Sequence, residues 1–552
     1  MSYRKNDFLL GRYYLKKDLT KENLYYIKRL KDMIRTSFGP LGNLKVLFDR
    51  RSGKYLVTKD GARILNELLS FHPAISVVAD AGISTKNEAG DGSLMATLLS
   101  CELFEKAVKL MESGLHPANI VEGYMQALRD SLEIINMYTR PLVCHDENLI
   151  FALAKSIIIT KVDSSSANYI ARLVTNILSK HLPYTKDYNQ LSDIIVVRER
   201  VGGSIDDSKI FRGVLLHKSG VDLLMPKVVR DAKIAIVDND LGFKRTGLDV
   251  NVVIKEEWGI KNFYKTREDI MNEIIELLVK LGVNILLCSG NISDEMRRIL
   301  TRNNILAIRN VSLHDIKIIA NATRATVVSN VKSLTPAYLG FCETVRELIV
   351  SALDRWTLFE NCIDPRYYSL LIRGFSENIV ASVKGSVLDC IKVISKAVNY
   401  GGYVCGGGSL EMRIATYLRK SYYKHDGKKQ LALLAYADAI EDSIVSLGEN
   451  CGIDPVSAKT QLRSAHNRGE MGGINAFTRS IVNMEGTDII DAAHVKAQLF
   501  KSATEAAIML IRADFGYFRE KIRQKPKDVI PAPVKLVRDV TDSYLKRLSS
   551  KK

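Results

Sequence analysis

The chain has 552 residues, of which 46% are hydrophobic and 26% are charged, with only 12 prolines. This composition excludes disordered, collagen-like and mucin-like chains, and the length corresponds to roughly three to four domains. Eight cysteines are scattered without any C-x-x-C pair, so their spacing supports neither a disulfide framework nor a zinc site. We therefore expect a folded, multidomain protein of a reducing compartment.

The net charge is +17, from 79 Lys and Arg against 62 Asp and Glu. A basic balance can indicate a nucleic-acid partner, but these cations are spread along the chain, with only a short basic tail at its end. The N-terminal segment has no apolar run typical of a secretory signal, and no stretch approaches the roughly 18 apolar residues of a membrane span. We expect a cytoplasmic protein without a membrane partner, and we disfavour a nucleic-acid partner.

The first third of the chain is expected to be helical. Between 94 and 111, apolar side chains recur at steps of three and four, and Ser113-Gly114 supplies the stop. Glycine-containing turns at 39–42, 59–61 and 90–92 separate such segments. Because loops held between rigid helices often carry function, these turns are the first candidates for a site.

From about 209 to 369 the pattern changes to alternating strands and helices, which indicates an α/β domain. Strands are expected at 233–237, 283–288, 305–308 and 325–329, with a helix at 293–302. Thr266-Arg-Glu-Asp269 resembles a capping box and predicts a helix start there. Helical periodicity returns after about 405, so the α/β domain is expected to be inserted into a helical one.

Three glycine-rich turns could hold a nucleotide. Gly90-Asp91-Gly92-Ser93 opens a helix, whose free N–H groups can bind phosphate while Asp91 offers an oxygen to Mg²⁺. Thr58-Lys59-Asp60-Gly61 is a second carboxylate turn, and Gly406-Gly407-Gly408-Ser409 precedes another helix. Taken singly, the two Asp turns are explained as well by plain helix caps, Gly61 supplying a positive φ. The chain has no Walker A loop and no Rossmann fingerprint.

Taken in order, these segments resemble the group II chaperonins, the family of thermosomes and the eukaryotic cytosolic chaperonin. The motifs that carry the likeness are TSFGPLG (36–42), VTKDGARIL (57–65), AGISTKNEAGDGS (81–93), LHPANIVEGY (115–124), VLDCIKVISKA (387–397), CGGGSLE (405–411), LGENCGIDP (447–455) and VKAQLFKSATEAA (495–507). They extend over nearly the whole chain. MPKVVRDAKIAIVD (225–238) looks most like the alpha subunit of the eukaryotic complex.

The resemblance implies the three-domain fold of this family. We expect an all-α equatorial domain that binds ATP (1–144 and 403–525), an α+β intermediate hinge domain (145–208 and 370–402) and an α/β apical domain that binds clients (209–369). A helical protrusion is expected near 244–270, and a basic C-terminal tail over 526–552.

The resemblance also assigns roles to individual residues. Asp60 and Asp389 match the two carboxylates that orient the attacking water, and Asp91 matches the ligand of Mg²⁺. The residues expected to bind nucleotide are Gly39, Pro40, Gly42, Gly61, Gly90, Asp91, Gly92, Ser93, Lys161, Gly407, Gly408, Asn475 and Asp491. The cofactors implied are ATP and Mg²⁺.

The chain departs from the family pattern beside the phosphate turn. Where the family continues with a second Thr and a small polar residue, this sequence has Leu94 and Met95, which removes one or two hydrogen bonds to phosphate. The sequence around Lys161, expected to sense the γ-phosphate, is also altered, to Ser156-Ile-Ile-Ile-Thr160. These changes bear on nucleotide affinity and turnover.

The function implied is an ATPase chaperone subunit, which folds client proteins within a closing chamber. The partners implied are paralogous subunits in a double ring and unfolded clients such as cytoskeletal proteins. Two alternatives remain: a chaperonin-like assembly scaffold with weak or no hydrolysis, which Leu94 and Met95 favour, and a basic nucleic-acid-binding protein. Retention of Asp60, Asp91 and Asp389 argues against the scaffold.

Overall fold

A computed structural model of the chain describes residues 11–48, 53, 55–69, 71–184, 187–241, 257–351, 354–425 and 427–519. The chain divides into a terminal unit, Met1–Asn23 with Arg512–Lys552, and a large unit, Leu24–Ile511. In the terminal unit, strand β1 (Gly11–Leu15) pairs antiparallel with β17 (Phe515–Arg519). This pairing joins segments from the two ends of the chain.

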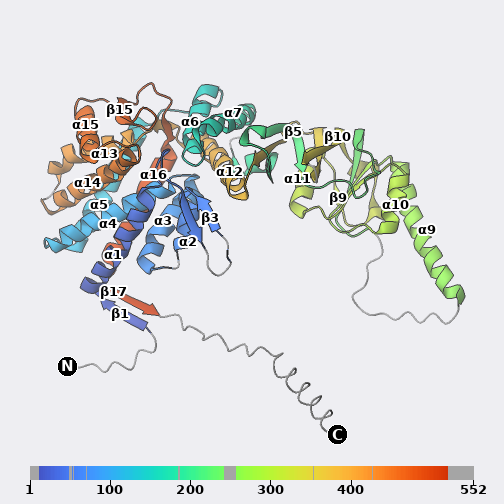
Figure 1. Cartoon of the computed structure of the whole chain (residues 1–552), viewed down its shortest axis with the longest axis horizontal. Helices are drawn as coiled ribbons and strands as arrows, with labels where there is room; N and C mark the ends of the chain where they lie inside the picture. Colours follow the sequence, from blue (N-terminus) through green and yellow to red (C-terminus); the bar gives the residue numbers. More distant parts are fainter. Residues whose placement is uncertain are drawn as a thin grey trace, which may run out of the picture. The chain divides into compact units, whose positions relative to one another are not determined.

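The first part of the large unit is a helical core built from both sides of the sequence. Its helices are α1 (Lys16–Arg35, from Leu24 onward), α2 (Gly61–Leu68), α3 (Pro73–Ala89), α4 (Ser93–Glu112), α5 (Pro117–Tyr138), α13 (Ser409–Ser421), α14 (Gly427–Asn450), α15 (Pro455–Asn467) and α16 (Ala493–Arg512, to Ile511). Helix α14 packs against α4, α5 and α13 (Figure 1). The expected period of three and four places Leu98, Cys101 and Phe104 of α4 in the buried core.

Small antiparallel sheets accompany these helices, so the expectation of an all-α domain is wrong. The strands are β2 (Lys45–Phe48) with β3 (Tyr55–Thr58), β13 (Tyr403–Cys405) with β16 (Ile490–Ala492), and β14 (Gly472–Asn475) with β15 (Ser480–Asn483). They are three or four residues long, and β14 reads Gly-Gly-Ile-Asn. Glycine and asparagine are depleted in strands, so local sequence carries no strand signal there.

A second group of helices follows the first core. It consists of α6 (Glu147–Ile159), α7 (Ser164–His181), α8 (Tyr188–Ile194) and α12 (Glu377–Tyr400). Helix α12 packs against strands of the large sheet near its beginning and against α3 and α6 farther along. Lys384 of α12 donates to Glu199 at 3.0 Å on the sheet side.

The inserted α/β region forms a nine-stranded sheet with the order β4-β12-β5-β11-β10-β6-β7-β8, and β9 pairs with β6. The strands are β4 (Ile195–Val201), β5 (Lys209–Leu216), β6 (Val228–Val237), β7 (Ile285–Cys288), β8 (Leu306–Ile308), β9 (Val327–Val328), β10 (Gly340–Ser351), β11 (Asp354–Cys362) and β12 (Tyr368–Gly374). Strands β6, β7 and β8 are parallel, as expected for an α/β arrangement. Strand β12 crosses the predicted domain boundary at 369/370, and the domain limits remain predictions.

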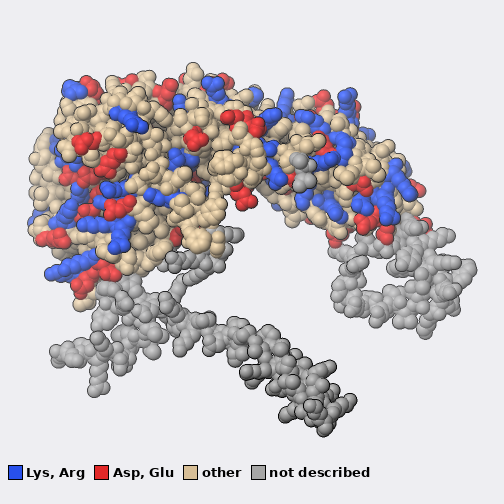
Figure 2. Space-filling view, in the orientation of Figure 1, with Lys and Arg blue, Asp and Glu red and all other residues tan. Residues whose placement is uncertain are grey.

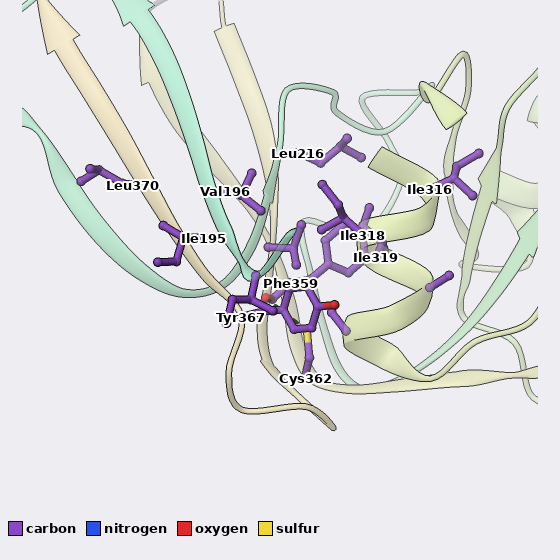
Figure 3. Packing of buried hydrophobic residues seen from close by; sticks show 14 of the residues in the cluster. Ile195, Val196, Leu216, Ile316, Ile318, Ile319, Phe359, Cys362, Tyr367 and Leu370 are labelled. Atoms are coloured by element: carbon purple, nitrogen blue, oxygen red, sulfur yellow. Dashed lines mark hydrogen bonds between the residues drawn. The ribbon is translucent and has the colours of Figure 1, made fainter. Parts of the chain in front are cut away.

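Helices α9 (Glu257–Leu281), α10 (Asp294–Arg302) and α11 (Leu313–Thr323) accompany the sheet. The apolar side of α11 packs against β5, β6 and β10. Figure 3 shows part of the resulting core, in which Ile318 and Ile319 of α11 lie toward Phe359, and the same cluster extends along the strands to Ile195 and Leu370. This packing explains the buried apolar runs that predicted strands here.

The predicted capping box at Thr266 is wrong, because α9 already begins at Glu257 and continues through Thr266. The Thr-x-x-Asp spacing therefore lies inside a helix, where no proline interrupts the preceding residues. The predicted protrusion near 244–270 falls partly on 242–256, which lie outside the described residues, as does the tail over 526–552.

Within the described ranges, no helix is both long and apolar enough to cross a membrane. Figure 2 shows acidic and basic side chains interspersed over the face in view.

Candidate nucleotide site

A cavity of about 440 Å³ lies in the large unit, where the ends of several helices and two loops meet. This volume is within the range of small-molecule sites. The predicted residues that line it are Gly39, Pro40, Gly61, Asp91, Gly92, Ser93, Lys161, Gly407, Gly408, Asn475 and Asp491. Gly42, Gly90, Asp60 and Asp389 are outside its lining, although the two carboxylates are close behind it, as described below.

Two helices begin at glycines in the cavity wall. Gly92 (φ 91°) precedes α4 and Gly408 (φ 77°) precedes α13, and neither helix has a side-chain cap. The Ser409 N–H of α13 donates to the Gly406 carbonyl at 3.1 Å, while the other N–H groups in the first turns of α4 and α13 have no side-chain cap. These groups can bind a ligand, and the positive ends of both helix dipoles lie at the cavity. This is an arrangement that can bind phosphate.

Gly407 lies where only glycine fits. It adopts a φ of 63°, and a Cβ atom there would lie 2.7 Å from the carbonyl oxygen of Ile474. The contact brings the backbone of the 406–408 turn directly against β14, and Ile474 N–H donates to the Gly407 carbonyl at 2.8 Å. The three glycines therefore form a wall without side chains.

Three carboxylates from separate segments are joined by two lysines. Asp60 Oδ2 lies 2.7 Å from Lys86 Nζ, which is 3.0 Å from Asp389 Oδ2. The same Asp389 oxygen is 2.8 Å from Lys161 Nζ, and Lys161 Nζ is 3.4 Å from Asp91 Oδ1. The structure thus brings together four predicted site residues from separate segments: Asp60, Asp91, Lys161 and Asp389.

The neighbouring charges shift the pKa values of Asp60 and Lys161. Burial would raise the pKa of Asp60, but Lys161, Lys86 and Arg63 outweigh burial and lower it to about 2. Burial would likewise lower the pKa of Lys161, but Asp91, Asp389 and Asp60 raise it above its usual value. Asp60 and Lys161 are therefore ionised at neutral pH.

A second charged cluster borders the cavity, at Asp491. The buried Lys496 Nζ lies 2.6 Å from Glu411 Oε1 and 2.7 Å from Asp491 Oδ2. Burial would lower the pKa of Lys496, but Asp491 and Glu411 raise it above its usual value. Among the described residues, the other oxygen of Glu411, Oε2, is buried without a hydrogen-bond partner, as is the hydroxyl of Ser409. These orphaned groups fit a site that takes a polar ligand.

The two residues that depart from the family pattern occupy different surroundings. Leu94 is half-buried in the cavity wall, and Met95 is 4% exposed within the helical core, although it also borders the cavity. Leu94 lies directly against Gly61, where a Cβ atom would be 2.5 Å from Leu94 Cγ. Gly61 has no positive φ, so the prediction that it supplies one is wrong; its small size makes room for Leu94 and Ser93.

Several of these side chains also have local structural roles, and the predicted helix cap at Asp60 is one of them. Asp60 caps α2, its Oδ1 accepting from the Ala62 N–H at 3.0 Å. Asn475 Oδ1 accepts from the N–H of Phe477 at 3.0 Å. Thr160 Oγ1 donates to the Ile157 carbonyl at 2.8 Å, so its hydroxyl is already engaged beside Lys161.

The cavity fits a magnesium nucleotide better than a metal held by protein alone. Among the described residues, no group of three or more His, Cys, Asp or Glu could hold a metal ion. Mg²⁺ in nucleotide sites is typically held by one or two carboxylates, substrate phosphates and water. The Asp91 carboxylate, 27% exposed and in the cavity wall, is suited to that role.

Sequence reasoning missed Lys86, Lys496 and Glu411. Lys86 is four residues before Gly90 in the last turn of α3, inside the motif AGISTKNEAGDGS, but the resemblance gave it no role. Glu411 and Lys496 are 85 residues apart, and their bond joins the beginning of α13 to the beginning of α16. Glu411 ends the motif CGGGSLE and Lys496 lies in VKAQLFKSATEAA, so their place in these motifs was the signal that could have indicated them.

Comparison with known proteins agrees with this geometry. Residues 30–515 match the model of the TCP-1/cpn60 chaperonin family. The chain is 30% identical to thermosome subunit beta of Desulfurococcus mucosus over 90% of its length and 99% of the relative's. It is 32% identical to thermosome subunit alpha of Archaeoglobus fulgidus and to thermosome subunit beta of Thermoplasma acidophilum, over 90% of this chain and 91% and 92% of theirs.

The chain therefore belongs to the TCP-1/cpn60 chaperonin family, and its thermosome relatives place it among the group II chaperonins. Chaperonins are ATP-binding chaperones of protein folding and are generally ATPases. The likeness to the alpha subunit of the eukaryotic complex stays a prediction.

Proposed function

We propose that this chain is an ATP-hydrolysing subunit of a cytosolic double-ring chaperonin, which folds non-native client proteins in a chamber that closes. The observation that carries the proposal is the meeting of Asp60, Asp91 and Asp389 with Lys161 beside a cavity walled by two glycine-capped helix starts. Phosphoryl transfer depends mainly on positioning and charge neutralisation, which such a site can supply.

Each residue then has a role within the site. The N–H groups of the first turn of α4, and those of α13 after Ser409, bind phosphate oxygens, and Asp91 would hold Mg²⁺, which would neutralise phosphate charge. Lys161 lies near enough to Asp91 to contact the terminal phosphate. Asp60 and Asp389 orient the attacking water, and Asp491 with Lys496 borders the far part of the cavity, where a ribose would be bound. Gly42 and Gly90 support the loops that carry the lining residues.

Two substitutions test the proposal in the assembled particle. We expect Asp389→Ala to retain nucleotide and to slow phosphate release by about a hundredfold or more, because the water loses its orienting carboxylate. Glu377→Ala, which removes an exposed carboxylate from the first turn of the same helix, is the control. Phosphate release is measured per particle. If the Asp389→Ala variant turns over ATP as fast as the control and the wild type, Asp389 does not orient the attacking water.

A scaffold without productive hydrolysis is the second candidate, and Leu94 favours it. An apolar side chain in the cavity wall stands where a hydroxyl would bind phosphate. Tight nucleotide binding by the wild-type particle without any phosphate release would support this alternative. The interspersed charges of Figure 2 give less support to a nucleic-acid partner, since diffuse contacts are screened by salt.

A further inference from the structure

Lys86 lies between Asp60 and Asp389, the two carboxylates that are proposed to orient the attacking water. Its Nζ atom is 2.7 Å from Asp60 Oδ2 and 3.0 Å from Asp389 Oδ2, and its side chain is 17% exposed. The two carboxylate oxygens are therefore no farther apart than the sum of these distances. Without a cation between them, two negative charges at this separation would repel each other.

The hydrogen bonds at these carboxylates fix some oxygens and leave one available. Asp60 uses Oδ1 to cap α2, accepting from Ala62, and Oδ2 to bind Lys86. Asp389 binds both Lys86 and Lys161 through the same oxygen, Oδ2. Within the described residues, the other oxygen of Asp389 therefore remains for a further ligand.

Lys86 also joins two elements that are far apart in sequence. Helix α12 is attached to this corner by other contacts: Arg63 donates to the Ala381 carbonyl at 3.0 Å, and Lys396 donates to the Glu88 carbonyl. Those contacts end on backbone oxygens. The bond from Lys86 reaches the Asp389 carboxylate itself, as does that from Lys161, but Lys86 also binds the Asp60 carboxylate directly and so links the two groups.

We propose that Lys86 is a positioning residue for ATP hydrolysis, which holds Asp60 and Asp389 at a fixed separation and presents the available oxygen of Asp389 to water. The inference rests on the proposed function. Lys86 touches neither nucleotide nor water in this role; it acts through the two carboxylates. A displacement of about 1 Å in such a site can cost about a hundredfold in rate.

Three variants of the assembled full-length chain test the role. Lys86→Met keeps the length of the side chain and removes its charge, Lys86→Arg keeps the charge, and Lys396→Met removes an α12 contact that does not reach a carboxylate. We expect Lys86→Met to lower kcat by about ten- to a hundredfold with KM for ATP changed by less than about twofold, because positioning and not binding is lost. Lys86→Arg should recover most of kcat, and Lys396→Met should leave it unchanged.

Amide hydrogen exchange gives a readout that does not depend on turnover. We expect Lys86→Met to accelerate exchange around Asp389 in α12 by about tenfold, since the carboxylates then repel each other. The double variant Lys86→Met/Asp389→Asn removes that repulsion and should return exchange toward the wild-type rate. Equal exchange in the single and double variants would overturn the inference.

The failure of the inference differs from the failure of the proposed function. Wild-type particles that hydrolyse ATP, together with a Lys86→Met variant of unchanged kcat, overturn the role of Lys86 alone. Wild-type particles that release no phosphate overturn the proposed hydrolysis and, with it, the positioning role. A Lys86→Met variant with raised KM and unchanged kcat would mean that Lys86 binds nucleotide, which also overturns the inference.

Discussion

Asp389 and Lys161 are 228 residues apart in the sequence, yet Asp389 Oδ2 lies 2.8 Å from Lys161 Nζ. The bond joins the middle of α12 to Lys161, two residues beyond the end of α6, beside the cavity. The carboxylates of the site therefore depend on the placement of α12 as well as on the glycine turns.

Asp91→Asn should weaken the binding of ATP in the presence of Mg²⁺. We expect the affinity to fall by about ten- to a hundredfold, because a charged ligand of the metal becomes neutral. Calorimetric titration with and without EDTA measures the effect, and the two proteins should differ little once Mg²⁺ is removed. Asp80→Asn, at an exposed position of α3, is the control. A difference that persists in EDTA would contradict the metal role.

Leu94→Thr should increase nucleotide affinity by about tenfold, the effect of one hydrogen bond to a charged group. Met95→Thr should instead lower the free energy of unfolding by about 2–4 kcal/mol, because Met95 is buried in the helical core. Nucleotide titration and thermal unfolding distinguish the two effects. An unchanged affinity in Leu94→Thr would mean that the lost hydroxyl is not what separates this cavity from its relatives.

Gly407→Ala should lower the free energy of unfolding by more than the backbone strain of alanine at a positive φ alone. Gly407 and Gly452 both have a positive φ, but a Cβ atom at Gly407 meets the Ile474 carbonyl at 2.7 Å, whereas nothing lies within 4 Å at Gly452. We expect a loss of about 1 kcal/mol in Gly452→Ala and about 2–4 kcal/mol in Gly407→Ala. Equal shifts of the melting temperature in the two variants would contradict this account.

His466 should make the protein less stable in mild acid. Its Nε2–H donates to the Gly472 carbonyl at 2.8 Å, and its buried Nδ1 has no partner among the described residues. Burial, with Arg413 nearby, lowers the pKa of His466 from 6.5 to about 4. Between these values the unfolded chain binds a proton that the folded chain does not, so the contribution is complete above about pH 6.5 and declines toward about pH 4.

The loss in that window should be about 2–3 kcal/mol for this residue. His466→Gln, whose amide can still donate to the carbonyl, should flatten the dependence of melting temperature on pH. His116→Asn, at an exposed helix cap, is the matched control. An unchanged slope in His466→Gln would contradict the assignment.

Local patterns in the sequence predicted the helices and the glycine turns, because both depend on residues that are close in the chain. The stripe of α4 and the stop at Ser113-Gly114 are confirmed. The strands β14 and β15 were missed, because glycine-rich pairing is decided by tertiary contacts and leaves no period in the sequence. For the same reason Lys86 was missed: an ordinary lysine acquires its partners only when α12 packs against α3.

Helix α12 contacts the sheet through the bond between Lys384 and Glu199. It contacts the carboxylates and lysines beside the cavity through Asp389. Its 24 residues form a rod of about 36 Å. If a tilt of this rod alters the affinity for nucleotide, a ligand on the sheet that favours one tilt must alter nucleotide binding, and nucleotide must change that ligand's affinity by an equal factor. In that case α12 would couple two binding sites that are tens of ångströms apart.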